Sequence, residues 1–257
     1  MTSICAPASR RWNRARLAAC ATVLTVSATT LVTGTSSAHA TTGVREFTQS
    51  ATFTVPVGVT GLTIDLWGAG GGGAGGSSAY RIVLGGGGGG GGGYVHGAIT
   101  VIPAQQISIT IGGGGAGGAA GAANAYGTAG TDGGSSSVAI GSRVLATATG
   151  GGGGQTPETE PPETAGGIGG SGTAPPETAL GGGGFVRQGG TGGSVAYGTQ
   201  QRRSEGGVSG QPANVGSSNP GAAATGGQGG FADYAISGSN SAGTAGSRGY
   251  ALLHWSF

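Results

Sequence analysis

Tyrosine, arginine and glutamine side chains that interrupt long glycine stretches are the residues of this chain best suited to binding chemistry. They occur in Tyr80-Arg81, in Phe185-Val186-Arg187-Gln188 and in Gln200-Gln201-Arg202-Arg203. Planar guanidinium groups hydrogen-bond carboxylates and sugar hydroxyls, and tyrosine is a favoured contact residue at interfaces. The candidate ligand-binding residues are therefore Tyr80, Arg81, Arg187, Gln200, Arg202 and Arg203. The alternative is that these side chains only cap the ends of a glycine scaffold.

Catalytic and metal-binding motifs have little support. His96 and His254 each fall in a predicted strand, and neither has a second histidine or cysteine at ligand spacing. Asp65 is expected on the solvent side of an alternating strand. The stretch 68–73 matches G-x-G-x-x-G, but no helix follows it to bind a pyrophosphate, and a chain without lysine has no P-loop. No serine has the nucleophile-elbow spacing. We expect no enzyme activity, no cofactor and no metal.

Two proline and glutamate repeats interrupt the glycine-rich part, at Pro157–Ala165 and Pro175–Ala179. Proline stiffens a connection and glutamate keeps it soluble, so we interpret these repeats as solvated turns. A weak calcium site built from their carboxylates is the alternative, although their spacing matches no known calcium loop.

The first forty residues have the order of a signal peptide. Arg10, Arg11, Arg14 and Arg16 precede an apolar run from Leu17 to Val32, and Ala38-His39-Ala40 ends the segment like a cleavage site. We expect a signal peptide over 1–40, cleavage after Ala40, and a single glycine-rich domain over 41–257. Twin-arginine export and a lipoprotein signal at Cys20 are the alternatives.

Composition after position 40 excludes several classes of protein. Seven arginines and nine acidic residues remain there, a net charge of −2, and lysine is absent, so we expect no nucleic-acid partner. Both cysteines precede position 41, which leaves no disulfides. Glycine supplies 64 of these 217 residues, so a conventional hydrophobic core can form only locally. We expect no membrane span after signal cleavage.

Period-two alternation of apolar residues predicts strands and no segment has a helical period, so the predicted class is all-β. Strands are expected mainly within 44–111, 135–149 and 250–257. Leu62, Ile64 and Leu66 share one face, and Ile107, Ile109 and Ile111 share another. The individual predicted strands are Glu46–Val55, Leu62–Trp67, Tyr94–Ile102, Gln106–Ile111, Val138–Ile140, Val144–Thr149 and Tyr250–Phe257.

The glycine tracts, within 68–93, 112–134 and 150–249, repeat at every third residue in places, as at Gly127, Gly130 and Gly133. Three residues per turn is typical of the extended left-handed helix, whose backbone groups point outward and must bond to neighbouring helices. We therefore expect a β-sandwich, jelly-roll-like, with an inserted bundle of polyglycine-II helices. The alternative is that the tracts are disordered linkers.

The segment Ala51-Thr-Phe-Thr-Val-Pro-Val-Gly-Val-Thr60, followed by Leu62-Thr-Ile-Asp-Leu-Trp-Gly-Ala-Gly-Gly-Gly-Gly73, resembles the opening of the bacterial glycine-rich domain family. Later motifs extend the resemblance to about residue 154, with Ala104 standing where the family has a turn glycine. Proteins of this kind include phage tail-fibre adhesins and the glycine-rich region of the anaplastic lymphoma and leukocyte tyrosine kinase receptors. The resemblance implies a β-sandwich with packed polyglycine helices, and ligand recognition by the segments that link them.

We conclude from the sequence that the protein is a secreted surface or binding protein that recognises a glycan or a surface protein. A structural component of a wall, sheath or spore matrix is the second interpretation, and self-association would fit it. A secreted enzyme is the third.

Overall fold

The structure is a computed structural model that describes residues 42–79, 82–156, 165–173, 181–194, 203–204, 206–213, 220–233 and 239–256. The predicted signal peptide, the Pro157–Thr164 part of the first repeat and the Pro175–Ala179 repeat therefore lie outside the described residues. Every strand pair in the described part is antiparallel, and this part contains no helix, which confirms the all-β class.

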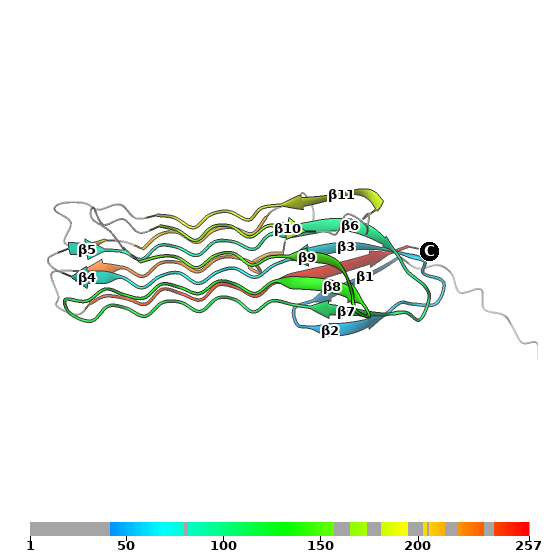
Figure 1. Cartoon of the computed structure of the whole chain (residues 1–257), viewed down its shortest axis with the longest axis horizontal. Helices are drawn as coiled ribbons and strands as arrows, with labels where there is room; N and C mark the ends of the chain where they lie inside the picture. Colours follow the sequence, from blue (N-terminus) through cyan, green and yellow to red (C-terminus); the bar gives the residue numbers. More distant parts are fainter. Residues whose placement is uncertain are drawn as a thin grey trace, which may run out of the picture. The chain divides into compact units, whose positions relative to one another are not determined.

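Two five-stranded sheets face each other (Figure 1). The first has the order β1-β14-β3-β6-β11 and the second β10-β9-β8-β7-β2. The strands of the first sheet are β1 (Gly43–Phe47), β14 (Tyr250–Trp255), β3 (Gly61–Trp67), β6 (Tyr94–Thr100) and β11 (Gly181–Arg187). Those of the second are β10 (Gly172–Thr173), β9 (Arg143–Ala148), β8 (Ser136–Ile140), β7 (Gln106–Thr110) and β2 (Ala51–Thr54). Two small pairs lie elsewhere, namely β4 (Ser77–Ala79) with β5 (Ile82–Leu84), and β12 (Arg203–Ser204) with β13 (Ala232–Asp233).

The hydrophobic core lies between the two large sheets. Its members from the first sheet include Ile64 and Leu253, and those from the second include Ile107 and Val138, all with no exposed side chain. The alternation predicted for Leu62–Leu66 and Ile107–Ile111 is therefore confirmed. Burying each such side chain contributes about 1.5–3 kcal/mol, so this layer is stabilised as in an ordinary sandwich.

Two predicted elements are wrong. The expected strand Glu46–Val55 is two strands, because β1 belongs to the first sheet and β2 to the second, so Phe47 and Phe53 both reach the core from opposite sheets. The glycine tract Gly181–Gly184 was expected among the glycine helices. It lies instead in β11, an edge strand bonded to β6, because an extended glycine chain forms whichever hydrogen bonds its neighbour offers.

The glycine-rich part consists of ten extended segments that run side by side away from the sandwich (Figure 1). Two inner segments, 68–76 and 85–93, are buried along their length. Eight outer segments surround them in this order: 112–121, 127–134, 150–155, 165–171, 188–194, 206–213, 224–231 and 241–249, with the last closing on the first. These segments are neither α-helices nor strands in the described residues, and their arrangement is defined by the hydrogen bonds between them.

That pattern repeats every three residues. In the first inner segment, Gly71 donates to Gly90, Gly72 to Thr131 and Gly73 to Thr244, and the next residue, Ala74, returns to the first neighbour at Gly87. Every backbone N–H from Gly68 to Gly76 and from Gly86 to Gly93 donates in this way. Successive residues thus bond to three different neighbours, which a flat sheet cannot provide and a bundle can.

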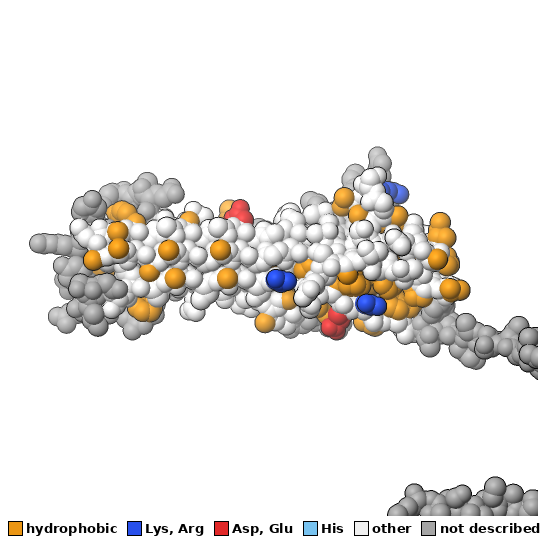
Figure 2. Space-filling model, turned by 90° about the horizontal axis from the view of Figure 1, so that it is seen from below, with side chains coloured by type: hydrophobic (Ala, Val, Ile, Leu, Met, Phe, Trp, Pro, Cys, Tyr) orange, Lys and Arg blue, Asp and Glu red, His pale blue; other side chains and the backbone are white. Residues whose placement is uncertain are grey.

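Glycine is required in the inner segments by close approach of neighbouring backbones. A methyl group added at Gly72 would lie 1.9 Å from the Ala116 carbonyl oxygen, and one added at Gly90 would lie 2.2 Å from that of Ile168. At Gly113, on an outer segment, the same methyl group would meet nothing within 4 Å. Figure 2 shows that, on the face drawn, the outer surface of these segments carries isolated hydrophobic groups and few charges.

Aromatic residues mark the points where strands give way to glycine segments. Trp67 ends β3, whereas Tyr94 begins β6 and Tyr250 begins β14. The three residues are cross-strand neighbours, and their rings contact, with centroids 4.6 Å apart for Trp67 and Tyr94 and 5.6 Å apart for Trp67 and Tyr250. They form an aromatic row across the first sheet where the period of the chain changes from two to three.

Candidate functional site

Five connections between glycine segments begin and end at described residues on the side of the segments away from the sandwich, which we call the distal end. They are residues 77–84, 122–126, 156–164, 195–205 and 232–240. The described segment ends are bonded to one another there: Gly76 donates to Ser241, Gly121 to Gly76, and Gln155 to Ala165. The chain order therefore brings the described ends of five connections, which are far apart in sequence, to one end of the segments.

The sequence-predicted binding residues divide between the two ends. Tyr80, Arg81, Gln200 and Arg202 lie outside the described residues, but the connections that contain them begin and end at the distal end. Arg203 lies in β12, which pairs with β13 and contacts β5. Arg187 does not join them, because it ends β11 in the sandwich opposite Tyr94. The structure therefore places Arg187 apart from the connections that contain the other five residues.

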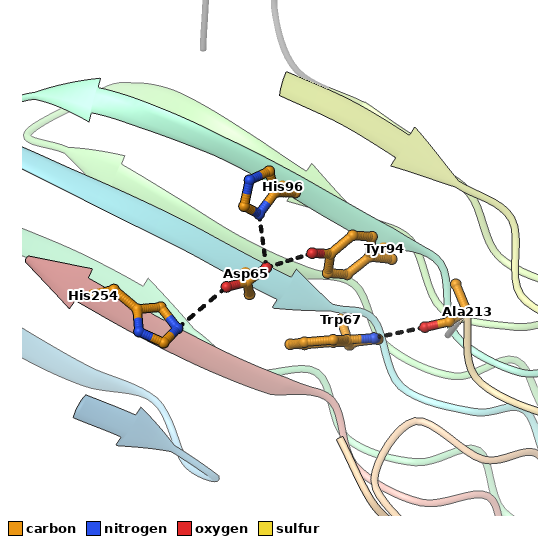
Figure 3. Close-up of polar contacts among 6 residues, drawn as sticks. All are labelled: Asp65, Trp67, Tyr94, His96, Ala213 and His254. Carbon is orange, nitrogen blue, oxygen red and sulfur yellow. Dashed lines mark hydrogen bonds and ion pairs between the residues drawn. The ribbon is translucent and has the colours of Figure 1, made fainter. Parts of the chain in front are cut away.

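A buried carboxylate on the outer face of the first sheet is a second candidate site (Figure 3). Asp65, on β3, is 2 % exposed. It accepts a hydrogen bond from the Tyr94 hydroxyl, its Oδ1 lies 2.8 Å from His96 Nδ1, and its Oδ2 lies 3.4 Å from His254 Nε2. The three partners stand on the two strands that flank β3, so the carboxylate ties β6, β3 and β14 together.

This cluster corrects the expectation that Asp65 faces solvent. It does lie on the face opposite Leu66, but its neighbours cover it. Strand pairing makes the cluster, because Asp65 lies opposite both His96 and Leu252, and alternation within one strand carries no information about those neighbours. The signal available in the sequence was limited to Asp65, His96 and His254, each in a predicted strand.

The chemistry of the cluster is that of hydrogen-bond satisfaction. A buried carboxylate is unfavourable unless hydrogen-bond donors compensate it. Here the Tyr94 hydroxyl donates to Asp65, and ring nitrogens of His96 and His254 lie beside its two oxygens. Burial, followed by the hydrogen bond and the charge of Asp65, raises the pKa of Tyr94, so that its hydroxyl stays a donor. Among the described residues, no serine, threonine or cysteine side chain hydrogen-bonds Asp65. Within the same residues no group of His, Cys, Asp or Glu is arranged to hold a metal ion.

The outer face beside this cluster is covered close to the glycine segments. The indole Nε1 of Trp67 donates to the Ala213 carbonyl oxygen over 2.9 Å, and Ala213 and Ala224 pack on Trp67 and Tyr94 (Figure 3). Trp67 and Tyr94 are thus covered by the segments that contain Ala213 and Ala224.

The alternating strands, the inner glycine segments and the aromatic row all fall within one family model, that of the glycine-rich domain, which matches residues 45–256. The chain belongs to the glycine-rich domain family. No curated protein matches it. In this glycine-rich domain, no helix among the described residues is long and apolar enough to cross a membrane.

Proposed function

We propose that this glycine-rich domain is a secreted, non-enzymatic binding module. Its glycine segments act as a stiff support, and the distal connections contact a glycan or a surface protein. The single observation that supports this most strongly is the convergence of five connections at one end of the segments. Connections between rigid elements are where binding residues concentrate in other folds.

The residue types of these connections suit recognition. Tyr80, Arg81, Gln200, Arg202 and Arg203 belong to two of the five connections, and the strands β5 and β12 beside them are in contact. Tyrosine supplies a large contact area, and the planar guanidinium of arginine supplies several donors in a fixed geometry. The absence of lysine and the net charge of −2 after position 40 argue against a nucleic-acid partner. Export is proposed from the basic, apolar and A-x-A order of the first forty residues.

The proposal is tested with a variant that removes distal donors and a control that removes arginines elsewhere. Tyr80→Ala, Arg202→Ala and Arg203→Ala are combined, and the control combines Arg143→Ala with Arg248→Ala, both on exposed sites outside the distal connections. Binding to immobilised glycans and to cell-envelope fractions is measured for the full chain and both variants. We expect the triple variant alone to lose binding. Unchanged binding by a triple variant of unchanged melting temperature would move the site elsewhere.

A second candidate function, a component of a wall, sheath or spore matrix, is favoured by one observation. Two neighbouring outer segments have backbone N–H groups without a partner in the described residues, at positions 114, 117 and 120 and at positions 242, 245 and 248. These N–H groups could donate to a further extended segment, as the N–H groups of the inner segments donate to their neighbours. Sedimentation of the full chain decides between the roles, because a matrix component forms large assemblies and a binding module stays of fixed size.

A further inference from the structure

An open groove on the flank of the glycine segments is lined mainly by polar atoms. Its volume is about 360 Å³, and its floor is the outer segment 150–155 at Gly150 and Gly152. One wall is Asp132 and Ser135, and the other is Ile168 with the residues that follow it. The groove follows from the arrangement of the segments, because 150–155 contacts both inner segments and so lies between its two outer neighbours.

The groove presents both donors and an acceptor. Gly150 and Ile168 line the groove, and their backbone N–H groups have no partner in the described residues. Asp132 is exposed, and its Oδ1 accepts from the Gly153 N–H over 2.8 Å, which holds the carboxylate across the floor. Ile168, 69 % exposed, adds an apolar surface to the opposite wall.

We infer that this groove binds one or two units of a neutral saccharide, an inference that rests on the proposed role in extracellular recognition. A sugar carries hydroxyls that accept from the N–H groups and donate to the carboxylate, and its apolar C–H face suits Ile168. The carboxylate disfavours an anion such as phosphate, and the amide N–H groups disfavour a cation.

An extended peptide is the competing occupant, because the groove is also the place where one more glycine segment would lie. Side chains already occupy several of the bonds that such a segment needs. Asp132 accepts from the Gly153 N–H, Gln155 Nε2 donates to the Gly153 carbonyl oxygen, and Gln188 Nε2 donates to that of Gly169. A long peptide would have to displace these side chains, whereas a compact sugar would not.

The test titrates the full chain with glucose, galactose, mannose and N-acetylglucosamine, and their disaccharides, while the amide resonances of Gly150, Ile168 and Gly169 are followed. The variant Asp132→Asn keeps an oxygen for the Gly153 N–H but loses the charged acceptor. Glu46→Gln is the matched control, since it removes a carboxylate on β1. We expect saturable shifts at these amides with at least one sugar, and affinity about tenfold or more weaker in Asp132→Asn only.

Three results would overturn the inference. The first is that none of the sugars shifts the groove amides, and the second is that Asp132→Asn binds as well as the unaltered chain. The third is that a glycine-rich peptide shifts these amides while the sugars do not. The distal triple variant separates this inference from the proposed function: sugar binding lost in that variant, with the groove amides unmoved, would contradict the groove and support the distal site.

Discussion

The sandwich of this protein is stabilised mainly by its side chains, whereas the glycine segments are stabilised mainly by their backbone. In the sandwich, side chains such as Ile64 and Ile107 fill the space between two sheets. In the glycine segments there are almost no side chains to bury, and each inner N–H is instead bonded to a neighbouring segment. Removing atoms should therefore damage the first region, and adding atoms should damage the second.

The comparison also shows why the glycine segments need many neighbours. Ordering one residue's backbone costs about 1–2 kcal/mol, and more for glycine than for other residues. A hydrogen bond returns a net of about 0.5–1.5 kcal/mol. A segment with one neighbour is therefore not stable, whereas an inner segment donates to three neighbours and accepts from others. The ring of outer segments is what makes the inner ones possible.

The largest effect is expected from adding one methyl group to an inner segment. Gly90→Ala places its Cβ 2.2 Å from the Ile168 carbonyl oxygen, a backbone atom that cannot move without its segment. We expect a loss of more than about 4 kcal/mol in the free energy of unfolding, measured by denaturant titration. Gly113→Ala is the control, because its methyl group meets nothing within 4 Å and its effect should be within about 1 kcal/mol of zero. Equal effects at the two sites would contradict the close-packed arrangement.

Removing side-chain atoms from the sandwich should have the next largest effect. Ile107→Ala empties a fully buried site in the core and should cost about 2–5 kcal/mol by the same titration. Val57→Ala, at a side chain that is 83 % exposed, should change stability by less than about 0.5 kcal/mol. A loss at Val57 as large as that at Ile107 would mean that the core is misplaced.

High pH should destabilise the junction between the sandwich and the glycine segments, where Tyr94 and Tyr250 lie. Burial, followed by the charge and hydrogen bond of Glu46, raises the pKa of Tyr250 to about 12, and the pKa of Tyr94 is raised as well. A phenol in the unfolded chain titrates near pH 10, so this stabilisation is complete below about pH 10 and is lost as the pH rises toward 12. The melting temperature should fall across that window, and less steeply for Tyr250→Phe. A melting temperature that stays constant to pH 12 would argue against buried phenols.

The smallest effect is expected at a turn of the sandwich. Ala104 has a φ of 65° between Pro103 and Gln105, and Gln105 donates to Ile102 to close the turn. A residue other than glycine is strained there, so Ala104→Gly should raise stability by about 0.5–1 kcal/mol. Ala116→Gly, at an exposed position without positive φ, should lower stability slightly. The two substitutions would then have opposite signs, and equal signs would refute the strained turn.

Most strands of the sandwich could be predicted from the sequence, whereas the pairing between those strands could not. Alternation identified β3 and β7 and their buried faces, because one buried face imposes period two on a single strand. The division of Glu46–Val55 between two sheets was missed, since alternation continues through the bend at Thr48–Ser50. The Asp65 cluster was missed because it depends on which strands become neighbours.

The sequence predicted that the glycine tracts would be extended segments packed on one another, but it did not predict which segments are neighbours. The two inner segments coincide with long glycine runs, interrupted only by Ala69 and Ala74, because a methyl group at the glycine positions would meet a neighbouring backbone. The outer segments hold alanine, threonine and serine on their open sides, so their glycines recur less regularly. Glycine composition alone does not separate β11 from these segments, so the position of Arg187 in the sandwich could not be predicted.

Hydrogen exchange of the backbone amides tests the central claim, that the inner glycine segments are held by bonds to their neighbours. The amides of Gly86–Gly93 all donate within the structure, whereas those of Gly114, Gly117 and Ala120 have no partner in the described residues and provide an internal reference. We predict that the first group exchanges about a thousandfold or more slowly than the second. If Gly86–Gly93 exchange as fast as the reference amides, the tracts are linkers and this account of the protein is wrong.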